Sequence, residues 1–178
     1  MEASATYEYV VQQKGKKVLI KKAVFITLYF AYVIGLFVLG TIIKLILPCL
    51  AFVPLTLWII AFFTWKHTNI EFEYSMTAGE ITVSNIYGGR SRKTVTRLRI
   101  KDCELIAPLN EENRDRLVRF GAEKSFSALS SPDAEDAYFA IYKDGDKKCV
   151  FYFEATDRAL KICKFYNSHA TVTGHVSR

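Results

Sequence analysis

The segment IEFEYSMTAGEITVSNIYGGRSRKTVTRLRI, residues 70–100, decides the fold because apolar and polar side chains alternate along most of its length. Alternation with a period of two is typical of half-buried β-strands. Two glycine-containing stretches interrupt it, TAGE at residues 77–80 and GGRSR at residues 88–92, and glycine favours turns in which φ is positive. The segment therefore predicts three consecutive strands joined by two short turns.

The chain beyond residue 100 predicts more elements of the same kind. CELIA at 103–107 reads as a fourth strand, and AYFAIYK at 137–143 and KCVFYFE at 148–154 read as a hairpin because DGDK lies between them. NEENRDRLVRF at 110–120 predicts a short helix capped by its asparagine. TDRALKICKFYN at 156–167 predicts an amphipathic helix capped by its threonine or aspartate.

Together these elements predict an α+β domain at residues 66–167. We expect a bent antiparallel sheet or open barrel of six to seven strands, capped at one end by the C-terminal helix, because that arrangement buries the apolar face of both. Residues 168–178 show no periodic pattern, so we expect a flexible tail.

The chain upstream of this domain is of a different kind. Residues 23–43, AVFITLYFAYVIGLFVLGTII, and residues 45–65, LILPCLAFVPLTLWIIAFFTW, contain no charged side chain. A helix of about 20 apolar residues matches the roughly 30 Å hydrocarbon core of a bilayer. Lys44 and Pro48 mark the reversal between the runs, so residues 23–65 predict a hairpin of two transmembrane helices, about 23–43 and 48–65.

Basic residues predict how this hairpin is oriented. Residues 1–22 form a basic N-terminal segment, whereas the tip of the hairpin carries one cation, Lys44. The positive-inside rule places both termini in the cytoplasm and the tip outside, which predicts a multi-pass protein of the plasma membrane. The lysines of the segment can also attract anionic lipid head groups; they are Lys14, Lys16, Lys17, Lys21 and Lys22.

Composition narrows the class of protein. The formal net charge of +6 comes largely from the membrane anchor, so the high isoelectric point does not argue for nucleic-acid binding. The 4 cysteines are far apart and form no C-x-x-C pair, which fits a reduced cytoplasmic domain without a disulfide framework.

A stripe of cations in the third predicted strand is the best candidate for a binding surface. One interpretation is contact with anionic lipid or with an acidic partner. The other is a solvated strand face whose cations pair with Glu71, Glu73 and Glu80 across the sheet, which is common and weakly stabilising. The stripe consists of Arg90, Arg92, Lys93, Arg97, Arg99 and Lys101.

Two further features are weaker candidates for contact surfaces. The tyrosines of the late hairpin, Tyr138, Tyr142 and Tyr152, are expected to form an exposed aromatic face. In the first apolar run, Ala31 and Gly35 form a small-x-x-x-small pair that can seat the second helix or the helix of a partner.

Residues with catalytic or metal-binding potential do not form a recognisable constellation. His67, His169 and His175 have no cysteine or carboxylate at ligand spacing, and no nucleophile, zinc-protease or nucleotide-binding signature occurs. We therefore expect no catalytic, metal or cofactor site and do not expect an enzyme.

Phe72 to Pro108, together with FYFEATDRALKICKFYN at 151–167, resembles the opening strands, closing strand and capping helix of bacterial pleckstrin-homology-like (PH-like) domains. Two transmembrane helices before such a domain are similar to the layout of a family of uncharacterised bacterial membrane proteins. The resemblance implies the fold and not an activity. In phosphoinositide-binding relatives the loop between the first two strands is basic, whereas here it is TAGE, so no phosphoinositide site is implied.

These observations favour a membrane-anchored interaction module. In this interpretation the hairpin holds a PH-like domain at the inner face of the membrane, where it binds a protein partner or copies of itself. Two alternatives remain open: an accessory subunit of a membrane transporter or export complex, and a membrane enzyme of unrecognised type.

Overall fold

The structure is a computed structural model that describes residues 6–174 and 176. It divides into two compact units. The helical unit comprises residues 14–70 and 87–91, and the sheet unit comprises the chain before residue 14, residues 71–86 and the chain after residue 91.

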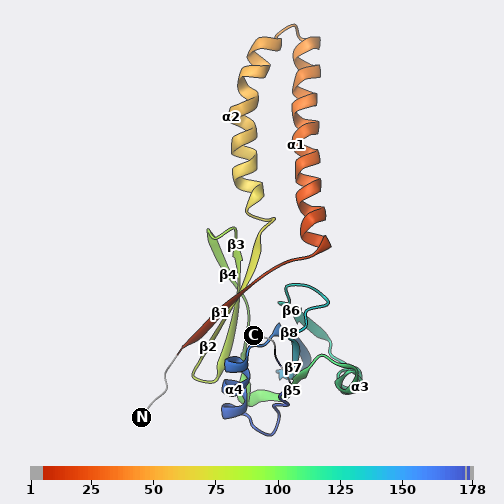
Figure 1. Cartoon of the computed structure of the whole chain (residues 1–178). Helices are drawn as coiled ribbons and strands as arrows, with labels where there is room; N and C mark the ends of the chain where they lie inside the picture. The colour runs from red at the N-terminus through yellow and green to blue at the C-terminus, as the bar shows by residue number, and fades with distance from the viewer. Residues whose placement is uncertain (1–5, 175, 177–178) are drawn as a thin grey trace. The chain divides into compact units, whose positions relative to one another are not determined.

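The helical unit consists mainly of two long helices, α1 (Lys16–Ile42) and α2 (Ile46–Trp65). They lie side by side as a hairpin, α1 in orange-red and α2 in yellow-orange (Figure 1). Two tyrosine–threonine pairs join them: the Tyr32 hydroxyl donates to Thr56 Oγ1 at 2.7 Å, and the Tyr29 hydroxyl bonds to Thr64. The polar hydroxyl groups of these otherwise apolar helices thus form hydrogen bonds with each other across the hairpin.

Both helices are long and apolar enough to cross a membrane. No described residue of α2 is buried within the protein, and large apolar side chains such as Phe30, Leu47 and Trp58 are exposed. An exposed apolar surface of this extent is typical of contact with a membrane or with another protein, and the helices have the length that crossing a bilayer requires.

Helix α1 begins earlier than the sequence predicts. It starts at Lys16 rather than at residue 23, and α2 starts at Ile46 rather than at residue 48. Lysine is a good helix former, and no glycine or proline interrupts residues 16–23, so the helix continues through the basic segment. The basic residues from Lys16 onward are therefore part of α1 and not a separate N-terminal segment.

The close approach of the two helices occurs at Gly40 and not at Gly35. A Cβ atom on Gly40 would lie 3.1 Å from Cβ of Cys49, whereas one on Gly35 would meet nothing within 4 Å. The Ala31–Gly35 pair therefore does not seat α2. The small residue that does so lies near the tip, where the turn brings the helices together.

The sheet unit contains two four-stranded sheets. The first has the order β1-β2-β3-β4, with β1 (Tyr7–Gln12), β2 (Ile70–Thr77), β3 (Glu80–Tyr87) and β4 (Ser91–Arg99). The three strands predicted from residues 70–100 are confirmed. Strand β1 was not expected, because residues 1–22 were predicted to lie outside the domain. It pairs antiparallel with β2, from Tyr7 opposite Met76 to Gln12 opposite Glu71.

The second sheet has the order β5-β7-β8-β6, with β5 (Cys103–Pro108), β6 (Lys124–Ser127), β7 (Ala137–Asp144) and β8 (Lys147–Glu154). A short 3-10 helix, Ile100–Asp102, connects the two sheets. The described residues thus form eight strands in two sheets, rather than the six to seven strands expected for a bent sheet or open barrel. Strand β6 is short, pairs parallel to β8, and lacks the alternating apolar pattern that would reveal it.

The two shorter helices match their capping signals. In α3 (Glu111–Phe120) the Asn110 side chain accepts the N–H of Asn113 at 3.1 Å. In α4 (Asp157–Tyr166) the Thr156 hydroxyl accepts the N–H of Ala159 at 3.2 Å. Both contacts satisfy amide groups that a helix start leaves free.

The core lies between the first sheet, the second sheet and α4. Tyr74 is fully buried and its hydroxyl donates to the Ala128 carbonyl at 2.6 Å. From α4, Leu160 and Cys163 are buried with it. On the other side of the second sheet, Leu117 and Phe120 of α3 pack against the cluster of Ala107, Phe139, Ile141 and Val150.

The exposed tyrosine face predicted on the late hairpin is wrong for two of its three members. Tyr138 is 1% exposed and Tyr142 is 6% exposed, whereas Tyr152 is intermediate. Strand β7 lies between β5 and β8, and its two faces are both covered. Alternation in a strand predicts an exposed face only where nothing packs on that face.

The tail predicted to be flexible is ordered over residues 168–174. Its backbone pairs with β5, since Ile106 N–H donates to the Ala170 carbonyl at 2.7 Å and Val172 N–H donates to the Ile106 carbonyl at 2.8 Å. The Gly174 N–H donates to the Tyr138 hydroxyl at 2.8 Å. Backbone hydrogen bonds fix this segment, and they leave no periodic pattern in the sequence. Residues 175, 177 and 178 of the predicted tail lie outside the described part.

Candidate functional site

The connection from α2 to β2, residues 66–69, forms a compact turn at the end of the helical hairpin opposite its tip. His67 N–H donates to the Thr64 carbonyl at 3.1 Å. Thr68 donates two hydrogen bonds to the Trp65 carbonyl, one from its N–H at 3.0 Å and one from its hydroxyl at 2.8 Å. These bonds use carbonyls that the end of α2 would otherwise leave exposed.

The β3–β4 turn, residues 88–90, contacts this connection. The Gly88 N–H donates to the Asn69 carbonyl at 2.8 Å. Gly88 has φ of 55°, and a Cβ atom there would lie 3.0 Å from Cα of Lys66. Gly89 has a similar φ of 68° but nothing within 4 Å of its Cβ position. Glycine is thus required at 88 for both backbone conformation and close approach.

Arg90 is held against an aromatic ring of α2. Its guanidinium carbon lies 4.1 Å from the centroid of the Phe62 ring, which is the geometry of a cation–π interaction. The sequence places these residues 28 positions apart. The basic turn that the sequence singles out is therefore attached to the end of an apolar helix.

A hollow of about 290 Å³ lies at this contact, and we call it the tryptophan hollow. Its walls combine three aromatic side chains with two cations and one amide. It is lined by Trp58, Ala61, Phe62, Trp65, Lys66, Asn69, Gly88 and Arg90.

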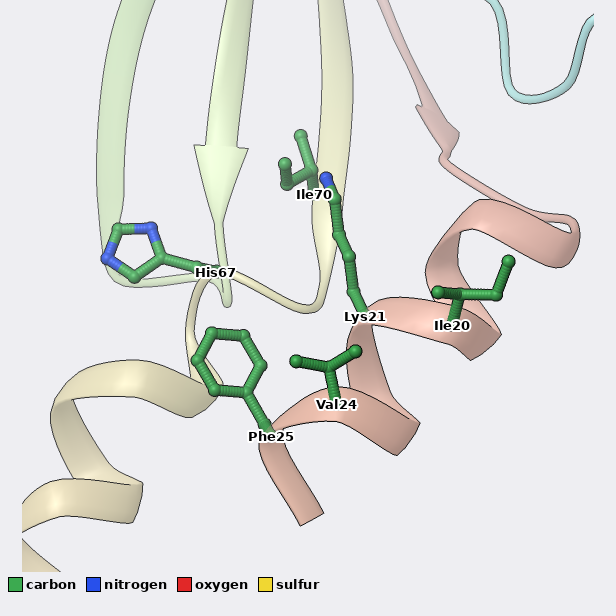
Figure 2. A pocket seen from close by; sticks show the side chains of 6 residues that line it. All are labelled: Ile20, Lys21, Val24, Phe25, His67 and Ile70. Carbon is green, nitrogen blue, oxygen red and sulfur yellow. The ribbon is translucent and has the colours of Figure 1, made fainter. Parts of the chain in front are cut away.

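A second hollow of about 410 Å³ lies near the same connection, between its residues and the first turns of α1. Figure 2 shows Val24 and Phe25 forming its apolar side, with the Lys21 side chain extending toward Ile70. The His67 ring completes it and meets the Tyr87 ring nearly edge-on, with centroids 5.7 Å apart. We call it the Lys21 hollow; Ile20 is its remaining member.

The predicted basic stripe is divided between the two units. Arg90 belongs to the helical unit and the other members belong to the sheet unit. The Arg92 guanidinium donates to Glu73 at 2.6 Å, with the Arg92 side chain 62% exposed and the Glu73 side chain 11% exposed. The remaining members are exposed and form no ion pair within the described chain; they are Lys93, Arg97, Arg99 and Lys101.

The lysines predicted to lie beside a membrane are exposed or half-buried at the start of α1 where their side chains are described. Lys14 and Lys16 are exposed, Lys22 is half-buried, and Lys21 lines the hollow of Figure 2. The side chain of Lys17 lies outside the described part of the structure. Cations at this level of an apolar helix can snorkel toward lipid head groups.

The thiols of the sheet unit are buried and free. Burial raises the pKa of Cys103 and of Cys163 from 9.0 to about 12. A nucleophilic cysteine needs a lowered pKa and access to solvent, so these two thiols are structural. Among the described residues, no three His, Cys, Asp or Glu side chains gather as metal ligands do.

A comparison with models of protein families finds a match over nearly the whole chain. The family model described as bacterial PH-like domain (DUF6106) matches residues 5–172. The chain belongs to this bacterial PH-like family. No curated protein and no solved structure matches it.

The bacterial PH-like family model covers more than the predicted domain at 66–167. The match includes β1, both long helices and the ordered tail up to residue 172. The matched residues therefore include the strand that pairs with β2 and the part of the tail that pairs with β5. Sequence periodicity missed both, because each is held by backbone hydrogen bonds to distant residues.

The sequence also missed the residues that surround Arg90. Trp65 and Lys66 close the second apolar run in the way typical of a membrane interface, which was a usable signal. The contact of Phe62 with Arg90 had no local signal, because it depends on how the β3–β4 turn folds back.

Proposed function

We propose that this PH-like protein is a membrane-anchored interaction module. In this proposal α1 and α2 cross the plasma membrane as a hairpin, and the sheet unit is held at its cytoplasmic face to bind a protein partner or further copies of the chain. The hydrophobicity and length of the helices support the anchor, and the family match supports the PH-like domain.

The pairing of β1 with β2 is the observation that most strongly supports a hairpin that crosses the membrane twice. Strand β1 precedes the hairpin and β2 follows it, and six consecutive residue pairs join them. Strands that pair must lie on the same side of a membrane. A hairpin that spans the bilayer twice satisfies this condition, whereas a single crossing does not.

The distribution of cations supports the cytoplasmic side. Lys14, Lys16, Lys21 and Lys22 lie before or within the first turns of α1, and Lys66 follows α2. The tip carries Lys44. Short loops rich in lysine and arginine stay in the cytoplasm.

The lining of the hollows favours binding over chemistry. Catalysis needs titratable groups that converge on a reacting atom. The walls of the tryptophan hollow and the Lys21 hollow consist of apolar side chains and cations, with one amide, Asn69, and one imidazole, His67, and they contain no carboxylate. Such walls suit an amphiphilic or anionic ligand.

Labelling single cysteines from outside intact cells tests the topology. Cys49 is replaced by alanine, and the buried Cys103, Cys149 and Cys163 are kept. A membrane-impermeant maleimide is expected to label Lys44→Cys at the tip and to leave Asp146→Cys, in the exposed β7–β8 turn, unlabelled until the cells are opened. Labelling of Asp146→Cys in intact cells would overturn the orientation.

A further inference from the structure

The tryptophan hollow combines features that a phospholipid head group and the start of its acyl chain would need. Trp58 and Trp65 are seven residues apart on α2, which is about 10 Å along the helix axis. Phe62 lies between them, with its ring centroid 5.7 Å from that of Trp58. An apolar aromatic wall therefore runs along the helix below the charged end of the hollow.

The charged end of the hollow presents hydrogen-bond donors and contains no negatively charged side chain. Lys66 and Arg90 supply two cations and Asn69 supplies an amide, while no acidic side chain lines the hollow. A guanidinium and an ammonium are the usual partners of phosphate oxygens. The charge of the hollow is thus complementary to an anionic head group.

The geometry also fixes the guanidinium in place before any ligand binds. Arg90 rests on the Phe62 ring at 4.1 Å, and the turn that carries it is joined to the α2 connection through the Gly88–Asn69 hydrogen bond. The negative end of the α2 dipole would oppose an anion here. Thr68 reduces that opposition, because its N–H and hydroxyl both bond the Trp65 carbonyl.

We propose that the tryptophan hollow is a binding site for one anionic phospholipid, tested below with phosphatidylglycerol. Lys66 and Arg90 contact the phosphate, and the acyl chain lies along Trp58 and Phe62. The proposal rests on the membrane insertion proposed above. It assigns to Arg90 a role different from that of the other cations of the predicted stripe.

Tryptophan fluorescence reports on this site, because the 2 tryptophans of the chain both line the hollow. The full chain is reconstituted into vesicles of phosphatidylcholine and phosphatidylglycerol at one fixed composition. In one sample the phosphatidylglycerol chains carry bromine, and in the other an equal amount of phosphatidylcholine does. Bromine quenches tryptophan on contact, so the ratio of quenching reports which lipid occupies the hollow.

We expect stronger quenching by brominated phosphatidylglycerol in the unaltered chain. The double variant Lys66→Gln/Arg90→Gln is expected to lose this preference, with about a fivefold drop in local enrichment for each cation removed. The matched control is Arg97→Gln/Lys101→Gln, which removes the same two charges from exposed positions. This control is expected to keep the preference.

The outcomes separate the lipid site from the membrane anchor. Equal quenching by both lipids in the unaltered chain would overturn the lipid site while supporting insertion of α2. The absence of quenching by either lipid would instead overturn the insertion on which both proposals depend. Loss of the preference in the control as well would show general charge attraction and would likewise overturn a site at the hollow.

Discussion

The ring of Tyr9, which precedes the two apolar helices, stacks on the ring of Tyr74, which follows them, with centroids 4.6 Å apart and planes inclined by 13°. The Tyr9 hydroxyl also donates to the Glu154 carbonyl at 2.8 Å. One side chain of β1 therefore connects β2 with the end of β8. Its environment raises the pKa of Tyr9 well above 10.0, chiefly through burial of the hydroxyl.

Replacing Tyr9 is expected to destabilise the sheet unit. Tyr9→Ala removes the stacked ring and the hydrogen bond and should lower the free energy of unfolding by about 2–3 kcal/mol. Tyr9→Phe keeps the ring and should cost about 1 kcal/mol. Urea unfolding of the full chain in detergent, followed by near-ultraviolet circular dichroism, measures both.

The control for Tyr9 is its neighbour on the opposite face of β1. Val10 is 52% exposed, so Val10→Ala should change the free energy of unfolding by less than about 0.5 kcal/mol. An equal loss in Tyr9→Ala and Val10→Ala would contradict the role given to the stacked ring.

A fragment that begins at residue 66 is expected to misfold, because it lacks β1. Without β1 the β2 edge, the ring of Tyr74 and the buried Met76 lose their cover. Joining residues 1–13 to residue 66 through a long glycine–serine linker should restore a folded, monomeric sheet unit. Size-exclusion chromatography and amide exchange compare the two; a well-folded fragment without β1 would contradict this prediction.

The Arg92–Glu73 ion pair is expected to contribute little to stability. A double-mutant cycle with Arg92→Gln and Glu73→Gln should give a coupling energy of about 0.5–1 kcal/mol, because Arg92 is largely exposed. The coupling should decrease in high salt. Arg97→Gln, at an exposed cation without an ion pair among the described residues, is the control and should be nearly neutral.

Gly88 and Gly89 form a natural comparison for the β3–β4 turn. Both have positive φ, so alanine at either position should cost about 1–2 kcal/mol of backbone strain. Gly88→Ala adds a contact of 3.0 Å with the backbone of Lys66 and should cost more. It should also shift the tryptophan emission, because the turn is pushed away from the hollow.

Gly89→Ala should leave the emission unchanged, since its Cβ position is open. Thermal unfolding and fluorescence spectra of the two variants test the pair. Identical spectra and stabilities would show that the turn does not depend on its contact with the end of α2.

The buried thiols predict a loss of stability at alkaline pH. Between pH 9.0 and about 12 the thiols of Cys103 and Cys163 are deprotonated in the unfolded chain and protonated in the folded one. The folded state then binds more protons, so the free energy of unfolding falls as pH rises through this interval. Below pH 9.0 these thiols contribute no pH dependence.

Urea midpoints of the full chain between about pH 8 and pH 11 measure this slope. Cys103→Ala/Cys163→Ala is expected to have a smaller slope, whatever its stability at neutral pH. An unchanged slope in that variant would assign the alkaline transition to other groups, such as Tyr74, whose pKa burial also raises.

Local sequence determined most of the secondary structure of this protein. The alternation in residues 70–100 predicted β2, β3 and β4, the capping residues predicted the starts of α3 and α4, and the length of the apolar runs predicted the long helices. Each of these signals lies within or directly beside the element that it predicts.

Only the tertiary structure decided which distant segments join. Strand β1, strand β6 and the tail are held by backbone hydrogen bonds, and a backbone group is the same in every residue, so the sequence carries no mark of its partner. The six cations of the predicted stripe were equivalent in the sequence. The contact of Arg90 with Phe62 distinguishes one of them, because a folded turn brings two residues together that no periodicity relates.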